Sequence, residues 1–337
     1  MKRHVNIPIF IPHLGCGNQC VFCNQRSISG VTEFDRTSVG HIIDEALKTV
    51  DPDCQVEIAF FGGSFTGIDR ELMIYLLETA RSYVVSGRAH SIRCSTRPDY
   101  INGEILDILE EYGVKVIELG LQSADDDVLR ACRRGHDFIS EEEACRLIVE
   151  RGFTLVGQMM IGLPLSTPEK ELRCADFIIS SGAKAARIYP TVVFKDTELC
   201  NMAYRGEYAP ISLDDAVKRT ADVMRRFIAA NVDVIRIGLH SSENLRSEEA
   251  YYAGPNHPAL GELVINEIYF DLISDALSGL PNNEKQNVNI VVGRGSLSKA
   301  IGQRRRNLVR LNEKFPFLNI TFSEGDAPSE YSISVER

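Results

Sequence analysis

The chain has 337 residues, of which 44% are hydrophobic and 25% charged, and its net charge is −10. This composition is ordinary for a globular protein, and the length suits one large domain with a smaller one. We find no run of about 18 apolar residues, no signal-peptide pattern and no transit leader, so we expect a cytoplasmic protein without membrane contact.

The first expected element is a buried strand, His4–His13, which leads into a loop with three cysteines. Cys16, Cys20 and Cys23 follow one another at C-x3-C-x2-C spacing, and neighbouring glycines keep the loop flexible enough for three thiolates to point inward. Three thiolates can bind three corners of a 4Fe–4S cluster and leave one iron open for a substrate or cofactor. A zinc site that lacks its fourth ligand, or three free thiols, are the alternatives.

The remaining six cysteines are isolated, and the odd total argues against a disulfide framework. We expect each of them to be a small buried hydrophobic residue: Cys54, Cys94, Cys132, Cys145, Cys174 and Cys200.

Beyond the cysteine loop, apolar runs alternate with segments of helical periodicity. Further strands are expected at Gln55–Phe61, His90–Ser95, Val114–Leu121, Phe153–Ile161 and Ala185–Thr191. Helices are expected at Val39–Val50, Glu71–Val84, Asn102–Tyr112 and Asp125–Arg134, then from a capping box of Ser140 and Glu143 to Arg151, and from Thr167 and Pro168 onward. Repeated strand–helix alternation predicts an α/β fold, a partial or full (β/α) barrel of about six parallel strands.

After Thr191 the pattern loosens into a helix at Ser212–Ala230, a strand at Val232–Leu239 and a helix at Gly261–Ser278. We place a domain boundary near residue 240, so that residues 1–240 form the barrel core and residues 241–337 a small α+β extension. In the extension we expect strands at Val288–Val292 and Leu318–Phe322, and helices at Ser296–Ile301 and Arg306–Lys314.

The extension contains a basic segment. Between Asn287 and Lys314 there are seven basic residues and one acidic residue, a net charge of +6, so the rest of the chain carries −16. Two helices joined by a glycine-bearing turn resemble a KH module, whose G-x-x-G loop clamps single-stranded RNA, although Arg305 stands at the second glycine position. A solvated basic helix face is the alternative. The RNA contacts that we predict are Lys299, Arg304, Arg305, Arg306 and Arg310.

Polar or glycine-rich residues follow the expected strands, at the ends where the chemistry of such barrels gathers. The glycines of Gly62-Gly63-Ser64 leave backbone carbonyls open to close approach. Arg134 can bind a carboxylate with both arms of its guanidinium, or can simply complement a helix C-terminus. The candidate cofactor contacts are Phe22, Gly62, Gly63, Ser64, Gln122, Arg134 and Gln158.

These motifs resemble those of radical S-adenosylmethionine (SAM) enzymes, and more narrowly the radical SAM half of the Elongator catalytic subunit and its shorter bacterial relatives. The resemblance covers Val5 to Leu239 and rests on the cysteine loop and on Gly62–Phe65, Ser95–Asp99, Glu118–Ser123, Arg134–His136, Gly157–Pro164 and Arg187–Pro190. It implies a 4Fe–4S cluster that cleaves SAM reductively to a 5′-deoxyadenosyl radical, with a reduced flavodoxin or ferredoxin as electron donor. In the similar oxygen-independent coproporphyrinogen oxidases, the matching glutamine and arginine contact SAM.

Three features depart from the relatives. The eukaryotic Elongator subunit spaces its first two cysteines farther apart than Cys16 and Cys20, and the relatives usually have Glu where this chain has Ser95. No segment resembles an acetyl-CoA pyrophosphate loop, so we do not expect acetyl transfer to carry over.

Our leading hypothesis is a radical SAM enzyme that modifies a tRNA or other RNA base. A radical SAM enzyme on a small, porphyrin-like substrate and a non-catalytic cluster-bearing RNA-binding protein are the alternatives, and no residue stands out as a general base or radical relay.

Overall fold

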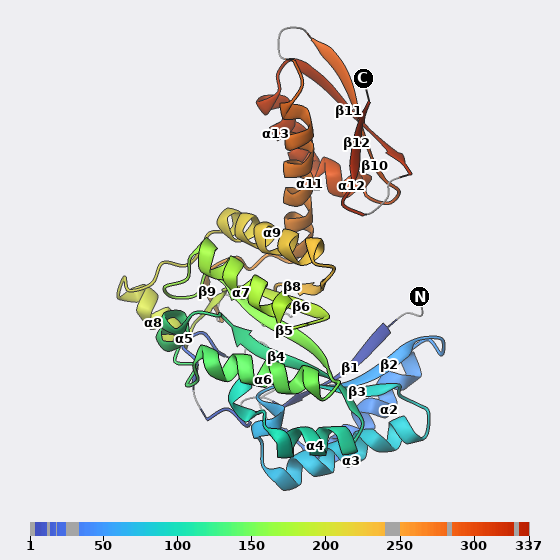
Figure 1. Ribbon diagram of the computed structural model, residues 1–337, viewed down its shortest axis with the longest axis vertical. Coiled ribbons are helices and arrows are strands. Elements are labelled where there is room, and N and C mark those ends of the chain that lie inside the picture. The colour runs from blue at the N-terminus through green and yellow to red at the C-terminus, as the bar shows by residue number, and fades with distance from the viewer. Residues whose placement is uncertain are drawn as a thin grey trace. The chain divides into compact units, whose positions relative to one another are not determined.

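A computed structural model describes residues 4–11, 14–17, 19–24, 34–239, 250–281, 285–326 and 330–336 (Figure 1). The chain forms two compact units, which we call the first and the second unit. Met1–Ser212 and Arg226–Asn256 make up the first, and Leu213–Arg225 and His257–Arg337 make up the second. The predicted boundary at residue 240 lies outside the described residues.

The first unit is built on a seven-stranded sheet in which every neighbouring pair is parallel. Its order, β1-β2-β3-β4-β5-β6-β8, follows the chain and curls into a half-barrel, which confirms the predicted α/β partial barrel. The seventh strand is added by β8, which pairs with β6. The strands are β1 (His4–Ile11), β2 (Gln55–Gly62), β3 (Ser91–Thr96), β4 (Val114–Gln122), β5 (Thr154–Ile161), β6 (Ala185–Pro190) and β8 (Asp233–Ile237).

Helices connect these strands and pack against the sheet (Figure 1). They are α2 (Val39–Thr49), α3 (Arg70–Val85), α4 (Gly103–Glu111), α5 (Asp126–Ala131), α6 (Phe138–Glu150), α7 (Pro168–Ser180) and α8 (Glu198–Tyr204), while α9 (Leu213–Ala229) contributes to both units. A two-stranded ribbon, β7 (Val193–Phe194) with β9 (Tyr251–Ala253), completes the first unit.

Local capping decides where two of these helices begin. The predicted Thr167 cap is confirmed, because its side chain accepts a hydrogen bond from the Lys170 amide. The predicted capping box of Ser140 and Glu143 is wrong: Asp137 caps α6 by accepting from the Ser140 amide, and Glu143 instead pairs with Arg146. The N-cap of α6 is therefore the carboxylate of Asp137, three residues before the predicted cap at Ser140.

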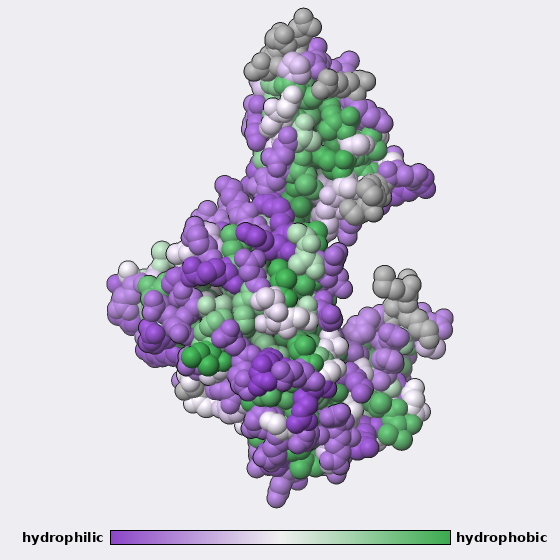
Figure 2. All heavy atoms as spheres, in the orientation of Figure 1, coloured by the Kyte–Doolittle hydropathy of each residue, from purple (hydrophilic) through white to green (hydrophobic). Residues whose placement is uncertain are grey.

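The core of the first unit consists of apolar strand and helix side chains, and Phe60 stacks on Phe65 with ring centroids 4.5 Å apart. Fully burying such a side chain stabilises the fold by about 1.5–3 kcal/mol. The visible surface over α6 and α7 mixes hydrophilic residues with hydrophobic and intermediate ones (Figure 2). Five of the six isolated cysteines are buried as predicted, whereas Cys54, in the turn before β2, is partly exposed.

The second unit packs the long helix α11 (Leu260–Ser278) and two short helices against a three-stranded sheet of order β11-β10-β12. Here β10 and β11 are parallel, and the predicted succession of strand, helix, turn, helix and strand is confirmed. The further elements are β10 (Gln286–Gly293), α12 (Leu297–Ile301), α13 (Arg306–Lys314), β11 (Leu318–Gly325) and β12 (Ile333–Glu336).

Candidate active site

A cavity of about 750 Å³ opens at the carboxyl ends of the parallel strands of the first unit. Every predicted cluster ligand and cofactor contact lines it, which brings together residues from the cysteine loop and from four strand ends. The lining contains Cys16, Cys20, Phe22, Cys23, Gly62, Gly63, Ser64, Gln122, Arg134 and Gln158, and also Gln19, Asn24, Ser95, Thr96, Arg97, Gly120, Arg133, Asp196, Thr197 and Glu198. The last ten were not among the predicted contacts.

Backbone hydrogen bonds hold the cysteine loop in this position. The Val21 amide donates to the Cys132 carbonyl at 3.2 Å, and the Val21 carbonyl accepts from the Leu199 amide at 2.8 Å. Val21 is buried in an apolar cluster of α5 and α8 residues, and Phe22 packs against the same cluster. The loop is therefore fastened to segments that lie more than a hundred residues away in sequence.

The double glycine after β2 is required by this loop. A Cβ atom added to Gly63 would lie 1.9 Å from the Leu14 carbonyl oxygen, and one added to Gly62 would lie 2.8 Å from the Ile11 carbonyl oxygen. The Gly63 and Ser64 amides donate to these same two carbonyls. Close docking of the cysteine loop is therefore a sufficient physical reason for the two glycines, in addition to the expected approach of a ligand.

The three cysteines are partly exposed at the cavity. Within the described ranges, no group of three or more His, Cys, Asp or Glu side chains is already arranged to hold a metal ion. The neighbouring Cys132 is not a competing thiolate, because burial raises its pKa to about 12. The loop thus places three partly exposed thiols at the cavity.

Two buried polar atoms at the cavity have no hydrogen-bond partner among the described residues: Gln122 Oε1 and Arg134 Nε. Gln122 has φ of 74° beside a register shift between β4 and β5. A non-glycine residue in this left-handed conformation is strained, and such strain clusters at functional sites. Gln122 Oε1 is a hydrogen-bond acceptor and Arg134 Nε is a donor, and a buried polar atom without a partner costs free energy. The two atoms therefore fit a polar ligand in the cavity.

Arg134 is 4% exposed and turns into the cavity. Its Nη1 donates to Cys20 Sγ at 3.2 Å, and its Nη2 donates to the Gly120 carbonyl. The guanidinium thus contacts the cysteine loop and β4, whereas the alternative was that it complements the C-terminus of a helix. Helix α5 ends at Ala131, before the predicted end at Arg134, because Arg133 and Gly135 adopt positive φ.

Charged residues inside the half-barrel hold the side chain of Gln158 in place. Its Nε2 donates to Glu118 Oε2 at 2.9 Å, and Glu118 also binds Arg93 at 2.8 Å and Arg187 at 2.7 Å. Arg93 continues to Glu57 at 2.6 Å. We call these four charged residues, Glu57, Arg93, Glu118 and Arg187, the buried ladder. It joins four strands across the interior of the sheet.

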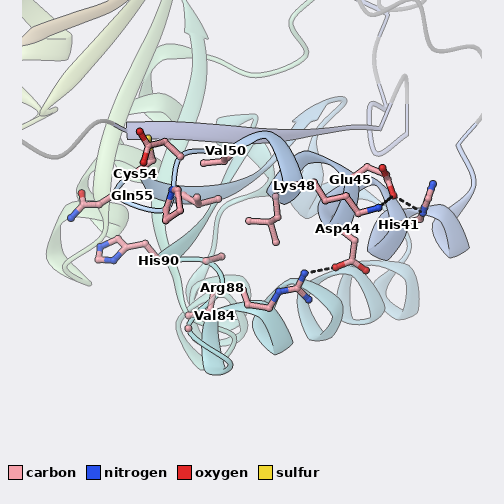
Figure 3. A pocket seen from close by; sticks show the side chains of 16 residues that line it. His41, Asp44, Glu45, Lys48, Val50, Cys54, Gln55, Val84, Arg88 and His90 are labelled. Atoms are coloured by element: carbon pink, nitrogen blue, oxygen red, sulfur yellow. Dashed lines mark hydrogen bonds and ion pairs between the residues drawn. The ribbon is translucent and has the colours of Figure 1, made fainter.

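A larger hollow of about 1090 Å³ lies elsewhere in the first unit, at the amino ends of β2 and β3 (Figure 3). Its charged side chains pair with one another, as in Arg88 with Asp44 at 2.6 Å and Lys48 with Glu45 at 2.5 Å. None of the predicted site residues lines it. Size alone thus does not locate the chemistry.

In the second unit, acidic residues engage most of the basic segment. Lys299 pairs with Glu330 at 2.5 Å and Arg306 with Asp214 at 2.9 Å. Arg310 binds Glu267 through both arms and lies 3.5 Å from the centroid of the Phe270 ring.

Arg304 and Arg305 are exposed and have positive φ in the turn after Gly302. Among the described residues they have no ionic partner. RNA contact by this segment stays a prediction, and it now falls mainly on these two residues.

The sequence matches family models over most of its length. The model described as the radical SAM superfamily matches residues 10–178, and the radical SAM C-terminal domain model matches residues 183–270. Within the described ranges, no helix is long and apolar enough to cross a membrane.

The individual relatives have low sequence identity to this chain. The chain is 25% identical over 196 residues to a tRNA uridine(34) acetyltransferase of Methanocaldococcus infernus, a match that covers 52% of this chain and 37% of the relative. It is 30% identical over 233 residues to an uncharacterized protein of Methanocaldococcus jannaschii, covering 66% of this chain and 70% of that protein.

A solved structure of the archaeal Elp3 of Methanocaldococcus infernus, with an N-terminal deletion, superimposes with a TM-score of 0.63 at 20% identity, over 80% of this chain and 63% of that one. The predicted resemblance to the Elongator catalytic subunit and short relatives is confirmed for the radical SAM part.

Proposed function

We propose that the substrate of this chain, which belongs to the radical SAM superfamily of enzymes, is an RNA base, with tRNA as the first candidate. The family uses a 4Fe–4S cluster and SAM, and the predicted cofactors are therefore confirmed at the level of the family. The observation that carries the RNA proposal is the match to the tRNA uridine(34) acetyltransferase. The chain spans 37% of that relative's length, so its acetyl chemistry is not part of the proposal.

In the proposed site, Cys16, Cys20 and Cys23 would hold the cluster and leave it accessible to SAM. When bound and reduced, the cluster would supply the electron for the reductive cleavage of SAM. The unpaired Gln122 Oε1 and Arg134 Nε are available for the polar groups of SAM, and Gln158 is held in place by Glu118. A reduced flavodoxin or ferredoxin as electron donor belongs to the same proposal.

The remaining proposed contacts have supporting roles. Phe22 lines the cavity on the apolar cluster of α5 and α8, where it excludes water and offers a ring to the adenine. The turn at Gly62, Gly63 and Ser64 presents backbone atoms to the amino-acid end of SAM. A dry and ordered cavity is the protein's contribution, since the cofactor carries the difficult chemistry.

One observation favours a small-molecule substrate instead. Four cations of the basic segment are already paired with acids, Arg294, Lys299, Arg306 and Arg310, which reduces the field that an RNA backbone would meet. The RNA proposal therefore depends on the exposed Arg304–Arg305 turn within the second unit.

Anaerobic reconstitution with iron and sulfide, then dithionite and SAM with or without tRNA, tests the proposal. We expect 5′-deoxyadenosine to form and tRNA to stimulate its formation, with a new modified nucleoside detected by mass spectrometry. Formation without any response to tRNA would favour the small-molecule alternative, and no formation under either condition would favour a non-catalytic protein.

Charge-removing variants sharpen this experiment. Arg304→Gln with Arg305→Gln removes two cations that have no ionic partner among the described residues, and we expect weaker tRNA binding with a smaller salt dependence. Arg294→Gln with Arg306→Gln removes the same charge from paired cations and serves as the control. Equal losses in the two double variants would contradict a specific role for the turn.

A further inference from the structure

Two guanidinium groups converge on the sulfur of Cys20. Arg134 Nη1 lies 3.2 Å and Arg97 Nη1 lies 3.8 Å from Cys20 Sγ. Cys16 is treated differently, because its Sγ meets the neutral hydroxyl of Ser64 at 3.6 Å. The environment of the cysteines is therefore asymmetric, with two positive charges aimed at one of them.

Arg97 has almost no freedom to turn elsewhere. Its Nε and Nη2 each lie 2.9 Å from one oxygen of Asp99, and its Nη2 also donates to the Arg134 carbonyl. The side chain is 6% exposed. A guanidinium is a rigid planar fork, so once two of its nitrogens are bound, the direction of the third is determined. That third nitrogen, Nη1, faces Cys20.

A second layer of buried titratable groups holds Asp99. His136 Nδ1 lies 3.4 Å from Asp99 Oδ1, and His136 Nε2 lies 3.1 Å from Glu141 Oε1. The side chains of His136 and Glu141 are 1% and 0% exposed. Neither residue lines the cavity, so neither is placed to touch a ligand there.

The ionisation of this layer follows from its contacts. Burial would raise the pKa of Asp99, but hydrogen bonds from His136 and Arg97 outweigh it and hold the pKa well below the usual range. Burial would lower the pKa of His136, but its bonds to Asp99 and Glu141 raise it. Asp99 thus stays an anion and keeps Arg97 in place.

We propose that Arg97 is a positioning residue that raises the reduction potential of the metal centre at Cys20, and that Asp99, His136 and Glu141 fix its direction. Reduction adds negative charge to the centre, and a fixed cation with an N–H···S bond stabilises the reduced form. Hydrogen bonds to cluster sulfurs and nearby charge are recognised determinants of such potentials. The inference rests on the proposed assignment of Cys20 as a cluster ligand, but not on the RNA substrate.

The test is an anaerobic potentiometric titration of the reconstituted protein, without SAM and without RNA. For Arg97→Gln we expect the equilibrium constant for reduction to fall about tenfold, which is a potential lower by ~59 mV for one electron. Arg133→Gln is the matched control, because Arg133 also lines the cavity but is 63% exposed and pairs with Glu198. Arg97→Lys keeps the charge without the fork and should fall between the wild type and Arg97→Gln.

Iron content is measured first for each variant, so that a failure of cluster assembly is distinguished from a change in potential. If Arg97→Gln does not assemble a cluster, Arg97→Lys carries the test. A change of less than roughly twofold in the equilibrium constant for the tested variant, or an equal change in Arg133→Gln, overturns the proposal. Weaker SAM binding at an unchanged SAM-free potential would identify Arg97 as a SAM contact instead.

Discussion

The buried ladder of the first unit and the basic segment of the second unit use arginines in opposite ways. In the first unit, Arg93 and Arg187 lie inside the half-barrel, and the Arg93 and Glu118 side chains are only 9% and 1% exposed. In the second unit, Arg306 and its partner Asp214 are 50% and 66% exposed. Both kinds of pair have similar distances, but the medium around them differs.

This difference decides what each charge contributes. A buried charge that loses its partner has no water to replace it, whereas an exposed charge is rehydrated at little cost. The buried ladder therefore holds the strand interior in one arrangement, and the surface pairs mainly reduce the net field of the basic segment. Four variants or conditions test this contrast, from the largest expected effect to the smallest.

Glu118→Gln should have the largest effect. It removes the carboxylate that pairs with Arg187, while Arg93 keeps Glu57, so the buried ladder is left with one uncompensated positive charge. We expect the free energy of unfolding of the first unit to fall by about 3–5 kcal/mol. Urea denaturation, with hydrogen exchange in β4, measures the loss. Glu104→Gln, at a pair that is 43% and 72% exposed, is the control and should change stability by less than about 1 kcal/mol. Similar losses in both variants would remove the distinction between buried and exposed ion pairs.

Arg310→Ala should have an intermediate effect in the second unit. Arg310 is 26% exposed, binds Glu267 with both arms and stacks over Phe270. We expect a loss of about 1–3 kcal/mol from the hydrogen bonds and the cation–π contact. Hydrogen exchange of α11 measures it. Unchanged hydrogen-exchange protection of α11 would mean that Arg310 does not stabilise this helix and is available to bind RNA.

Acid should act in opposite directions on Glu57 and Asp271. Burial would raise the pKa of Glu57, but the hydrogen bond from Ser91 and the charge of Arg93 outweigh it and lower the pKa. Its contribution is therefore complete above the unfolded value of about 4.3 and is lost as pH falls through the lower folded value. In the second unit burial raises the pKa of Asp271, so protonation as pH falls removes a penalty.

The two carboxyl variants check this sign. Glu57→Gln should flatten the acid-induced loss of protection in the first unit, and Asp271→Asn should flatten the gain in the second. Hydrogen exchange between about pH 6 and about pH 3.5 follows each unit separately. A steeper acid loss in Glu57→Gln than in the wild type would contradict the sign.

Arg306→Ala should have the smallest effect. Its pair with Asp214 is exposed, and we expect a change of about 0–1 kcal/mol that decreases further at high salt. Thermal unfolding at two salt concentrations measures it. A loss comparable to that of Arg310→Ala would show that exposure does not separate these cations.

Features that depend on near neighbours were predictable from the sequence. Alternating apolar runs predicted the parallel half-barrel, and the three cysteines and strand-end residues were correctly expected to meet at one edge. Parallel strands joined by crossovers must have their carboxyl ends on the same side. The cap of α6 was missed because Asp137 and Ser140 are equally good cap residues, and only the backbone path chooses between them.

Partners that lie far apart in sequence were not predictable. The basic segment has a net charge of +6 when it is counted from the sequence. In the structure, however, Arg306 is paired with Asp214 and Arg310 with Glu267. Arg97, Asp99 and His136 belong to motifs that the sequence shows, but their contacts with one another, with Glu141 of α6 and with Cys20 arise only because the segments after β3 and α5 meet in space.

The sequence by itself determined the architecture and the chemistry of the loop, because periodicity and motif spacing are local. Only the tertiary structure decided which charges are buried, paired or aimed at Cys20, because burial and electrostatic interaction depend on distances in space.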